Sequence, residues 1–171
     1  MTARSSILLA VAVTTGLSKA LAADPLLNTD FEGLSLKAFV STTEVGKGDG
    51  TDWTDALPGG WSMKYDGPVG DPVEFRGWRV MDVDSWIATE GNQDRGTWTR
   101  GGVGSRGSVL VADGDAYDDG TNIDTAQYDT FATTPAVSLD GIAPGSVTLS
   151  LDSFWRNETT QMGRVQVSFD G

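Results

Sequence analysis

The stretch "SVTLSLDSFW", residues 146–155, carries the clearest structural signal in the chain. In an extended conformation, Val147, Leu149, Leu151 and Ser153 share one face, and polar residues occupy most of the other face. Alternation with a period of two residues is typical of a half-buried β-strand. The stretch therefore predicts a strand of a β-rich domain.

Other short segments along the chain have the same character. They are rich in β-branched or alternating apolar residues, and turn formers such as "LPGG" (57–60) separate them. Runs with helical spacing are nearly absent after residue 22. Many short strands with Gly- and Pro-rich turns favour an all-β fold, an antiparallel β-sandwich. The segments are "LSLKAFV" (34–40), "WSMKY" (61–65), "EFRGWRVMDV" (74–83), "SWIAT" (85–89), "GTWTR" (96–100), "SVLVA" (108–112), "YDTFATT" (128–134) and "RVQVSF" (164–169).

The N-terminus has the pattern of a secretory signal peptide. An early Arg4 precedes an apolar stretch over residues 7–13, and small residues at Ala20 and Ala22 form an A-x-A cleavage pattern. We expect residues 1–22 to be the signal and residues 23–171 to be one domain of an exported protein.

The final "RVQVSFDG" predicts a strand and a hairpin turn with no return strand. The domain is therefore expected to be an incomplete part of a longer protein, with a downstream domain in the same chain.

Composition excludes several kinds of chemistry. The chain has no cysteine and no histidine, so Ser-His-Asp and Cys-His catalytic sites cannot form and typical zinc sites lose their preferred ligands. Loss of residues 1–22 would remove two basic residues and leave 10 basic against 24 acidic residues, a net charge of −14. This charge repels nucleic acid and anionic membranes and favours cations. The sequence has no second long apolar run, so no membrane insertion is predicted.

Several stretches together resemble the jelly-roll modules of MAM-like and cleaved-adhesin-like proteins, which are concanavalin A-like in fold. These stretches are "NTDFEGL" (28–34), "FATTPAVSLDG" (131–141) and "LSLDSFWRNETTQMGRVQVSFDG" (149–171). A further stretch, "GWRVMDVDSWIATEGNQDR" (77–95), resembles N-terminal regions of secreted bacterial proteins, some of which carry a downstream metallophosphoesterase domain. The resemblance implies a jelly roll in a secreted, modular context and implies no catalytic residue. It also implies that Glu32 contributes to a structural calcium site.

An acidic segment, "DGDAYDDGTNID" (113–124), is the main candidate metal site. Its carboxylates and a following glycine offer the oxygen ligands that calcium prefers, although the spacing differs from that of an EF-hand. The alternative is an exposed Asp/Gly turn, which these residues favour on their own. The candidate ligands are Asp113, Asp115, Asp118, Asp119 and Asp124. A second acidic stretch, "GDGTDWTD" (48–55), has the same two interpretations.

Tryptophan and carboxylate positions suggest two further kinds of site. The chain has six tryptophans, and exposed aromatic rings stack on sugars, so Trp53 and Trp61 are candidate glycan-binding residues. The alternative is that they lie in the core, because they bury a large area.

Asp82 and Asp84 would share one strand face, with Glu90 on the next turn, as a possible glycosidase pair. Alternating acids on a solvent-facing strand are the favoured interpretation, and no catalytic residue is predicted.

These observations lead to one main functional hypothesis and two alternatives. The main hypothesis is a secreted, non-catalytic module that binds a polysaccharide or cell-surface glycan, or acts in adhesion, with calcium as a structural ion. The first alternative is the N-terminal accessory part of a secreted hydrolase, such as a metallophosphoesterase, whose active site lies beyond Gly171. A glycosidase built on the sandwich itself is the least favoured.

Overall fold

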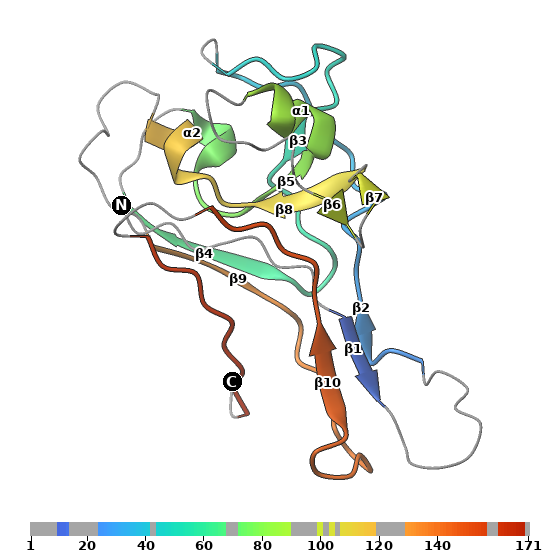
Figure 1. Ribbon diagram of the computed structural model, residues 1–171. Coiled ribbons are helices and arrows are strands. Elements are labelled where there is room, and N and C mark those ends of the chain that lie inside the picture. The colour runs from blue at the N-terminus through green and yellow to red at the C-terminus, as the bar shows by residue number, and fades with distance from the viewer. Residues whose placement is uncertain are drawn as a thin grey trace.

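The computed structural model describes residues 10–13, 24–41, 44–67, 72–89, 99–100, 103–104, 107–118, 129–156 and 161–169. Strands predominate in this part of the chain, and every strand pair in it is antiparallel. Two short α-helices and one 3₁₀ turn complete it (Figure 1). The predicted all-β class is thus confirmed. The elements are β1 (Ala10–Val13), β2 (Leu27–Asn28), β3 (Trp53–Thr54), β4 (Ser62–Asp66), η1 (Val73–Phe75), β5 (Arg79–Asp82), α1 (Val83–Ala88), β6 (Thr99–Arg100), β7 (Val103–Gly104), β8 (Ser108–Val111), α2 (Gly114–Asp118), β9 (Asp129–Thr133) and β10 (Val147–Ser150).

A sheet in the order β3-β5-β8 lies at the centre of the core. Successive residues of a strand point to opposite faces, and Val80 and Met81 of β5 accordingly belong to two different hydrophobic clusters. Both residues are fully buried. The sheet is therefore covered on both faces.

One cluster joins the helices to the sheet, and the other joins the N-terminal segment to it. The first contains Trp53, Phe75, Met81, Val83, Trp86, Val111, Ala116 and Tyr117. The second contains Phe31, Trp78, Val80 and Leu110, with Leu34, Leu36, Trp61 and Met63 packed against it. In Figure 1, α1 and α2 lie on one side of the β5–β8 pair, and the β4–β9 ladder lies on the other side.

The β4–β9 pair extends over five residue pairs, from Ser62–Thr133 to Asp66–Asp129. The exposed and half-buried residues of β4 alternate, as the stretch "WSMKY" predicts. Gly77 allows this ladder to approach the start of β5. It adopts φ +73°, and an added Cβ would lie 2.8 Å from the Thr130 hydroxyl. A side chain at this position would meet both strain and collision.

A separate sheet has the order β10-β1-β2, with β1 between its two partners. The register pairs Val13 with Val147 and Val11 with both Leu149 and Leu27. Strand β1 comes from the apolar stretch of the predicted signal peptide. Removal of this segment on export would leave β2 and β10 without the strand that joins them.

Three predicted strands are wrong. Residues 85–89 belong mostly to α1, because Asp82 caps a helix that buries Val83 and Trp86 three positions apart. Residues 34–40 form only an isolated bridge, in which Lys37 pairs with Trp53. Residues 164–169 form no strand, and their alternating apolar side chains are exposed. An alternating pattern becomes a strand only where a neighbouring backbone pairs with it.

Candidate functional site

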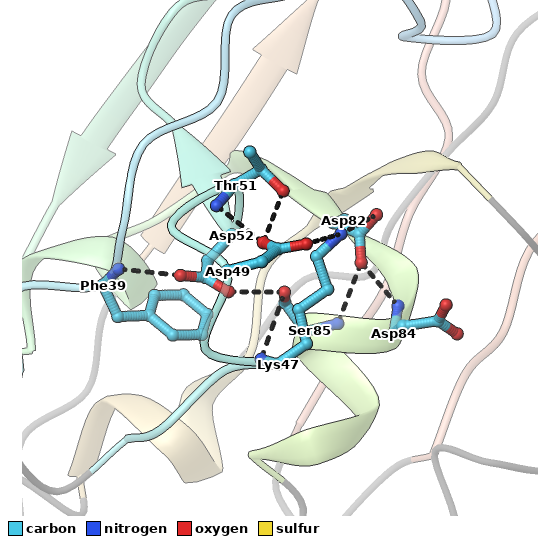
Figure 2. A network of polar contacts seen from close by, with 8 residues as sticks. All are labelled: Phe39, Lys47, Asp49, Thr51, Asp52, Asp82, Asp84 and Ser85. Carbon is cyan, nitrogen blue, oxygen red and sulfur yellow. Dashed lines mark hydrogen bonds and ion pairs between the residues drawn. The ribbon is translucent and has the colours of Figure 1, made fainter.

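A buried aspartate organises the polar network drawn in Figure 2. Asp52 is 3 % exposed, and its carboxylate accepts a 2.6 Å hydrogen bond from the Ser85 hydroxyl and a 3.2 Å bond from the Phe39 amide. An added Cβ at Gly46 would collide with this carboxylate. The Asp52 carbonyl also accepts a 2.8 Å bond from the Asp82 amide. A single residue thus ties the segment before β3 to the end of β5 and to α1.

Asp82 forms the second half of the network. One of its oxygens accepts bonds of 3.0 Å from the amides of Asp84 and Ser85 at the start of α1. Its other oxygen lies 3.0 Å from the Lys47 ammonium, which is also 3.4 Å from Asp49. Asp49 in turn accepts bonds from the amide and hydroxyl of Thr51. The prediction that Asp82 and Asp84 share one strand face is therefore wrong, because Asp82 is an N-cap and Asp84 lies in a helix.

The charges in this network shift the pKa values of two groups. Burial lowers the pKa of Lys47, but the hydrogen bond and charge of Asp82, helped by Asp49, outweigh this effect and raise it overall. The bonds from the hydroxyl and amide of Thr51 lower the pKa of Asp49, and the Lys47 charge acts in the same direction. Both groups are therefore held in their charged forms at neutral pH.

This geometry supports a structural clasp. The Ser85 side chain is fully buried, and its hydroxyl donates to a carboxylate whose other oxygen is bound to a backbone amide. A nucleophilic serine needs a base that can take its proton and a path to a substrate. The Ser85–Asp52 pair instead satisfies two buried polar groups.

The predicted calcium ligands occupy several different settings. Asp113 accepts a 2.9 Å bond from the Trp86 indole and a 3.1 Å bond from the Ala116 amide, so it caps α2. Asp115 lies in the first turn of α2, and Asp118 is its last residue. Asp119 and Asp124 lie outside the described residues. The segment predicted as an acidic loop thus begins as a short helix, and among the residues that the structure describes no group of three or more acidic side chains could hold a metal ion.

The Glu32 side chain binds a backbone amide. Its carboxylate accepts a 2.8 Å hydrogen bond from the Ser108 amide, at the first residue of β8. Gly107 precedes this contact with φ +85°, and an added Cβ there would collide with the Glu32 carboxylate. Glu32 therefore attaches the N-terminal segment to the central sheet.

The two candidate glycan-binding tryptophans differ in exposure. Trp53 is 2 % exposed, and its indole donates a 3.0 Å bond to the Ala38 carbonyl. The expectation that Trp53 offers a stacking platform is wrong, because core packing and the Lys37 ammonium, 4.2 Å from the ring centroid, cover its faces. Trp61 is half-buried and packs edge-on against Phe31 at 5.3 Å. Its role in ligand binding stays a prediction.

Sequence reasoning missed two buried charges. Glu74 is fully buried, and one of its oxygens accepts bonds of 3.1 Å and 2.7 Å from the amides of Val40 and Ser41. Arg79 is 6 % exposed within β5. Their neighbours in "EFRGWRVM" are largely apolar, but ionisable residues are seldom fully buried, so no local signal indicated the burial of these two.

Comparison with known proteins gives no relative for this chain. No protein-family model matches it, and no curated protein and no solved structure is significantly similar to it. In the part of the chain that the structure describes, no helix is long and apolar enough to cross a membrane. Functional conclusions must therefore come from the residues themselves.

Proposed function

We propose that this protein is an exported, non-catalytic binding module built on a jelly-roll β-sandwich. The main support is the use of its acidic side chains. Asp52, Asp82, Asp113 and Glu32 all accept hydrogen bonds that join one segment of the fold to another or cap a helix. Carboxylates in such roles build a scaffold, whereas acid–base catalysis needs carboxyl groups that face a substrate. A chain without histidine or cysteine has few other groups for catalysis.

The proposed ligand is a polysaccharide or a cell-surface glycan. Trp61 is half-buried, so part of the residue remains open to solvent. Trp155 is 38 % exposed and follows Phe154, which packs edge-on against Trp86 at 6.0 Å. An exposed indole beside an anchored aromatic residue is a suitable platform for a sugar ring. Trp155 therefore joins Trp61 as a candidate and replaces Trp53.

Retention on insoluble polysaccharides and a glycan array test this proposal. Trp155→Ala should weaken retention at least several-fold while leaving the thermal transition in place, because its side chain is partly outside the core. Trp53→Ala is not an informative variant, since it would open a cavity in the core. Absence of binding by the parent chain across the panel would contradict the glycan proposal.

Calcium is proposed as a structural ion of the acidic segment. Asp115 is a candidate ligand in the first turn of α2. A cation that binds only the folded state raises the melting temperature by mass action, about 2.7 kcal/mol at a hundredfold excess over the dissociation constant. Asp115→Ala should blunt the rise with millimolar calcium, and Asp84→Ala should leave it intact. Equal responses to calcium and to sodium chloride at matched ionic strength would show screening alone.

The alternative function is an accessory part of a secreted hydrolase, such as a metallophosphoesterase. Its support is the resemblance of residues 77–95 to N-terminal regions of such proteins. Sequencing of the complete gene separates the two proposals, because a metal-hydrolase domain downstream of Gly171 would favour the alternative.

A further inference from the structure

A buried cation stands out in this acidic chain. The side chain of Arg79 extends from the central strand β5, and the residue is 6 % exposed. One of its terminal nitrogens donates a 2.8 Å bond to the Trp78 carbonyl, and its Nε has no hydrogen-bond partner. Among the ion pairs of the described residues, none involves Arg79. Within the described part of the chain, the Arg79 guanidinium therefore lies in the interior without a bonded counterion.

Such an arrangement is costly unless something compensates the charge. A buried, unpaired ion costs several kcal/mol after relaxation, and an arginine does not escape by losing its proton at neutral pH. The carboxylate that acts on Arg79 through space is Asp55, but Asp55 is mostly exposed and is bonded to Lys37 at 2.8 Å. The Asp55 carboxylate thus compensates the positive charge of Arg79 only weakly.

The surroundings of Arg79 add further donors. Arg76 is half-buried and close enough for its charge to act on Arg79. Tyr65 of β4 donates a 3.0 Å hydrogen bond to Tyr117 of α2, and the charges of both arginines act on Tyr65. Burial, first, and this hydrogen bond raise the pKa of Tyr65, so its hydroxyl stays protonated at neutral pH. The charges of Arg79 and Arg76 thus act on each other and on Tyr65, whose hydroxyl joins β4 to α2.

We propose that Arg79 and Arg76 form a binding site for an oxyanion, a carboxylate, sulfate or phosphate group. Such a group accepts hydrogen bonds without donating any and matches the planar fork of a guanidinium. Arg76 is half-buried and Arg79 is 6 % exposed, so an anion from solvent would meet Arg76 first. The residues of this site differ from those of the proposed glycan surface, so failure of one proposal would not imply failure of the other.

Isothermal calorimetry and thermal unfolding of the full chain, titrated with inorganic phosphate and with sulfate at constant ionic strength, test the proposal. We expect saturable binding and a rise in melting temperature beyond that caused by sodium chloride. Arg79→Met should abolish the anion-dependent rise while leaving the anion-free protein at least as stable, because it removes a buried charge and keeps an unbranched, flexible apolar stem. Arg76→Gln should weaken binding at least tenfold.

A matched control and a second set of ligands complete the test. Lys64→Gln removes an exposed cation from β4 and should leave phosphate affinity unchanged. Glucuronate compared with glucose distinguishes an oxyanion carried on a sugar from a free inorganic ion. A wild-type response no larger than that to sodium chloride, or equal responses in Arg79→Met and wild type, would overturn the proposal.

Discussion

Replacement of Asp52 by alanine should be among the most damaging single changes in the chain. The variant loses the acceptor of a 2.6 Å bond from Ser85 and of a 3.2 Å bond from Phe39. Bonds to a charged group contribute about 1.5–3 kcal/mol each, and donors left unsatisfied add to the loss. The carboxylate is 3 % exposed, so relief of its desolvation offsets part of the cost. We expect a net loss of about 2–4 kcal/mol in the free energy of unfolding.

Urea unfolding followed by tryptophan fluorescence measures this loss as a lower midpoint at unchanged slope. Asp52→Asn keeps the shape and one accepting oxygen and should fall between the alanine variant and wild type. Asp55→Ala, three residues away, is the matched control. Its carboxylate is exposed and pairs with an exposed Lys37, so its loss should cost at most about 0.5 kcal/mol. If Asp52→Ala cost no more than Asp55→Ala, the clasp would carry no stability and the reasoning would be refuted.

Three further predictions follow from other features. Asp82→Ala should cost about 1–2 kcal/mol through loss of the α1 cap, whereas Asp84→Ala, within the same helix, should cost clearly less in the same urea titration. The hydrogen bond from Lys37 lowers the pKa of Asp55 below its ordinary value of 3.8. The pair therefore stabilises the fold fully above pH 3.8, and this contribution is lost as the pH falls through the pKa of Asp55 in the folded state. A Lys37→Met variant with an unchanged acid-unfolding profile would contradict this. A chain lacking residues 1–22 should self-associate with concentration in analytical ultracentrifugation, because β2 and β10 lose the strand between them, and a monomer at all concentrations would count against it.

Short-range patterns predicted part of this fold well. The stretches at 61–65, 108–112 and 128–134 form β4, β8 and β9 because alternating and β-branched residues match sheets that do exist in the structure. The stretch at 85–89 failed for a local reason. Its β-branched residues favour a strand, but Asp82 and the spacing of Val83 and Trp86 favour a capped helix. A capping signal in front of an apolar pair was the better guide.

The burial of the candidate site residues could not be predicted from their neighbours in the sequence. Trp53 lies in a loop rich in aspartate, which predicts exposure, yet pairing with Lys37 and packing under α1 enclose it. Arg79 occupies a strand position where a polar residue normally marks the solvent face. In the fold the residue is 6 % exposed, and the Tyr65–Tyr117 hydrogen bond joins β4 to α2 from distant parts of the chain. No pattern within a few residues of Arg79 contains that arrangement.

The acidity of the chain has a local explanation in its turns and helix starts. Asp82 and Asp113 each accept a bond from the amide three residues ahead, and Asp49 accepts one from the amide two residues ahead. Aspartate is favoured at such positions because its short side chain reaches back to the backbone and complements the positive end of a helix. Each of these carboxylates accepts a backbone hydrogen bond from its own turn, and Asp82 and Asp49 also share the Lys47 ammonium. An excess of aspartate in a turn-rich β protein therefore indicates capping chemistry first, and a metal site only where several carboxylates also converge.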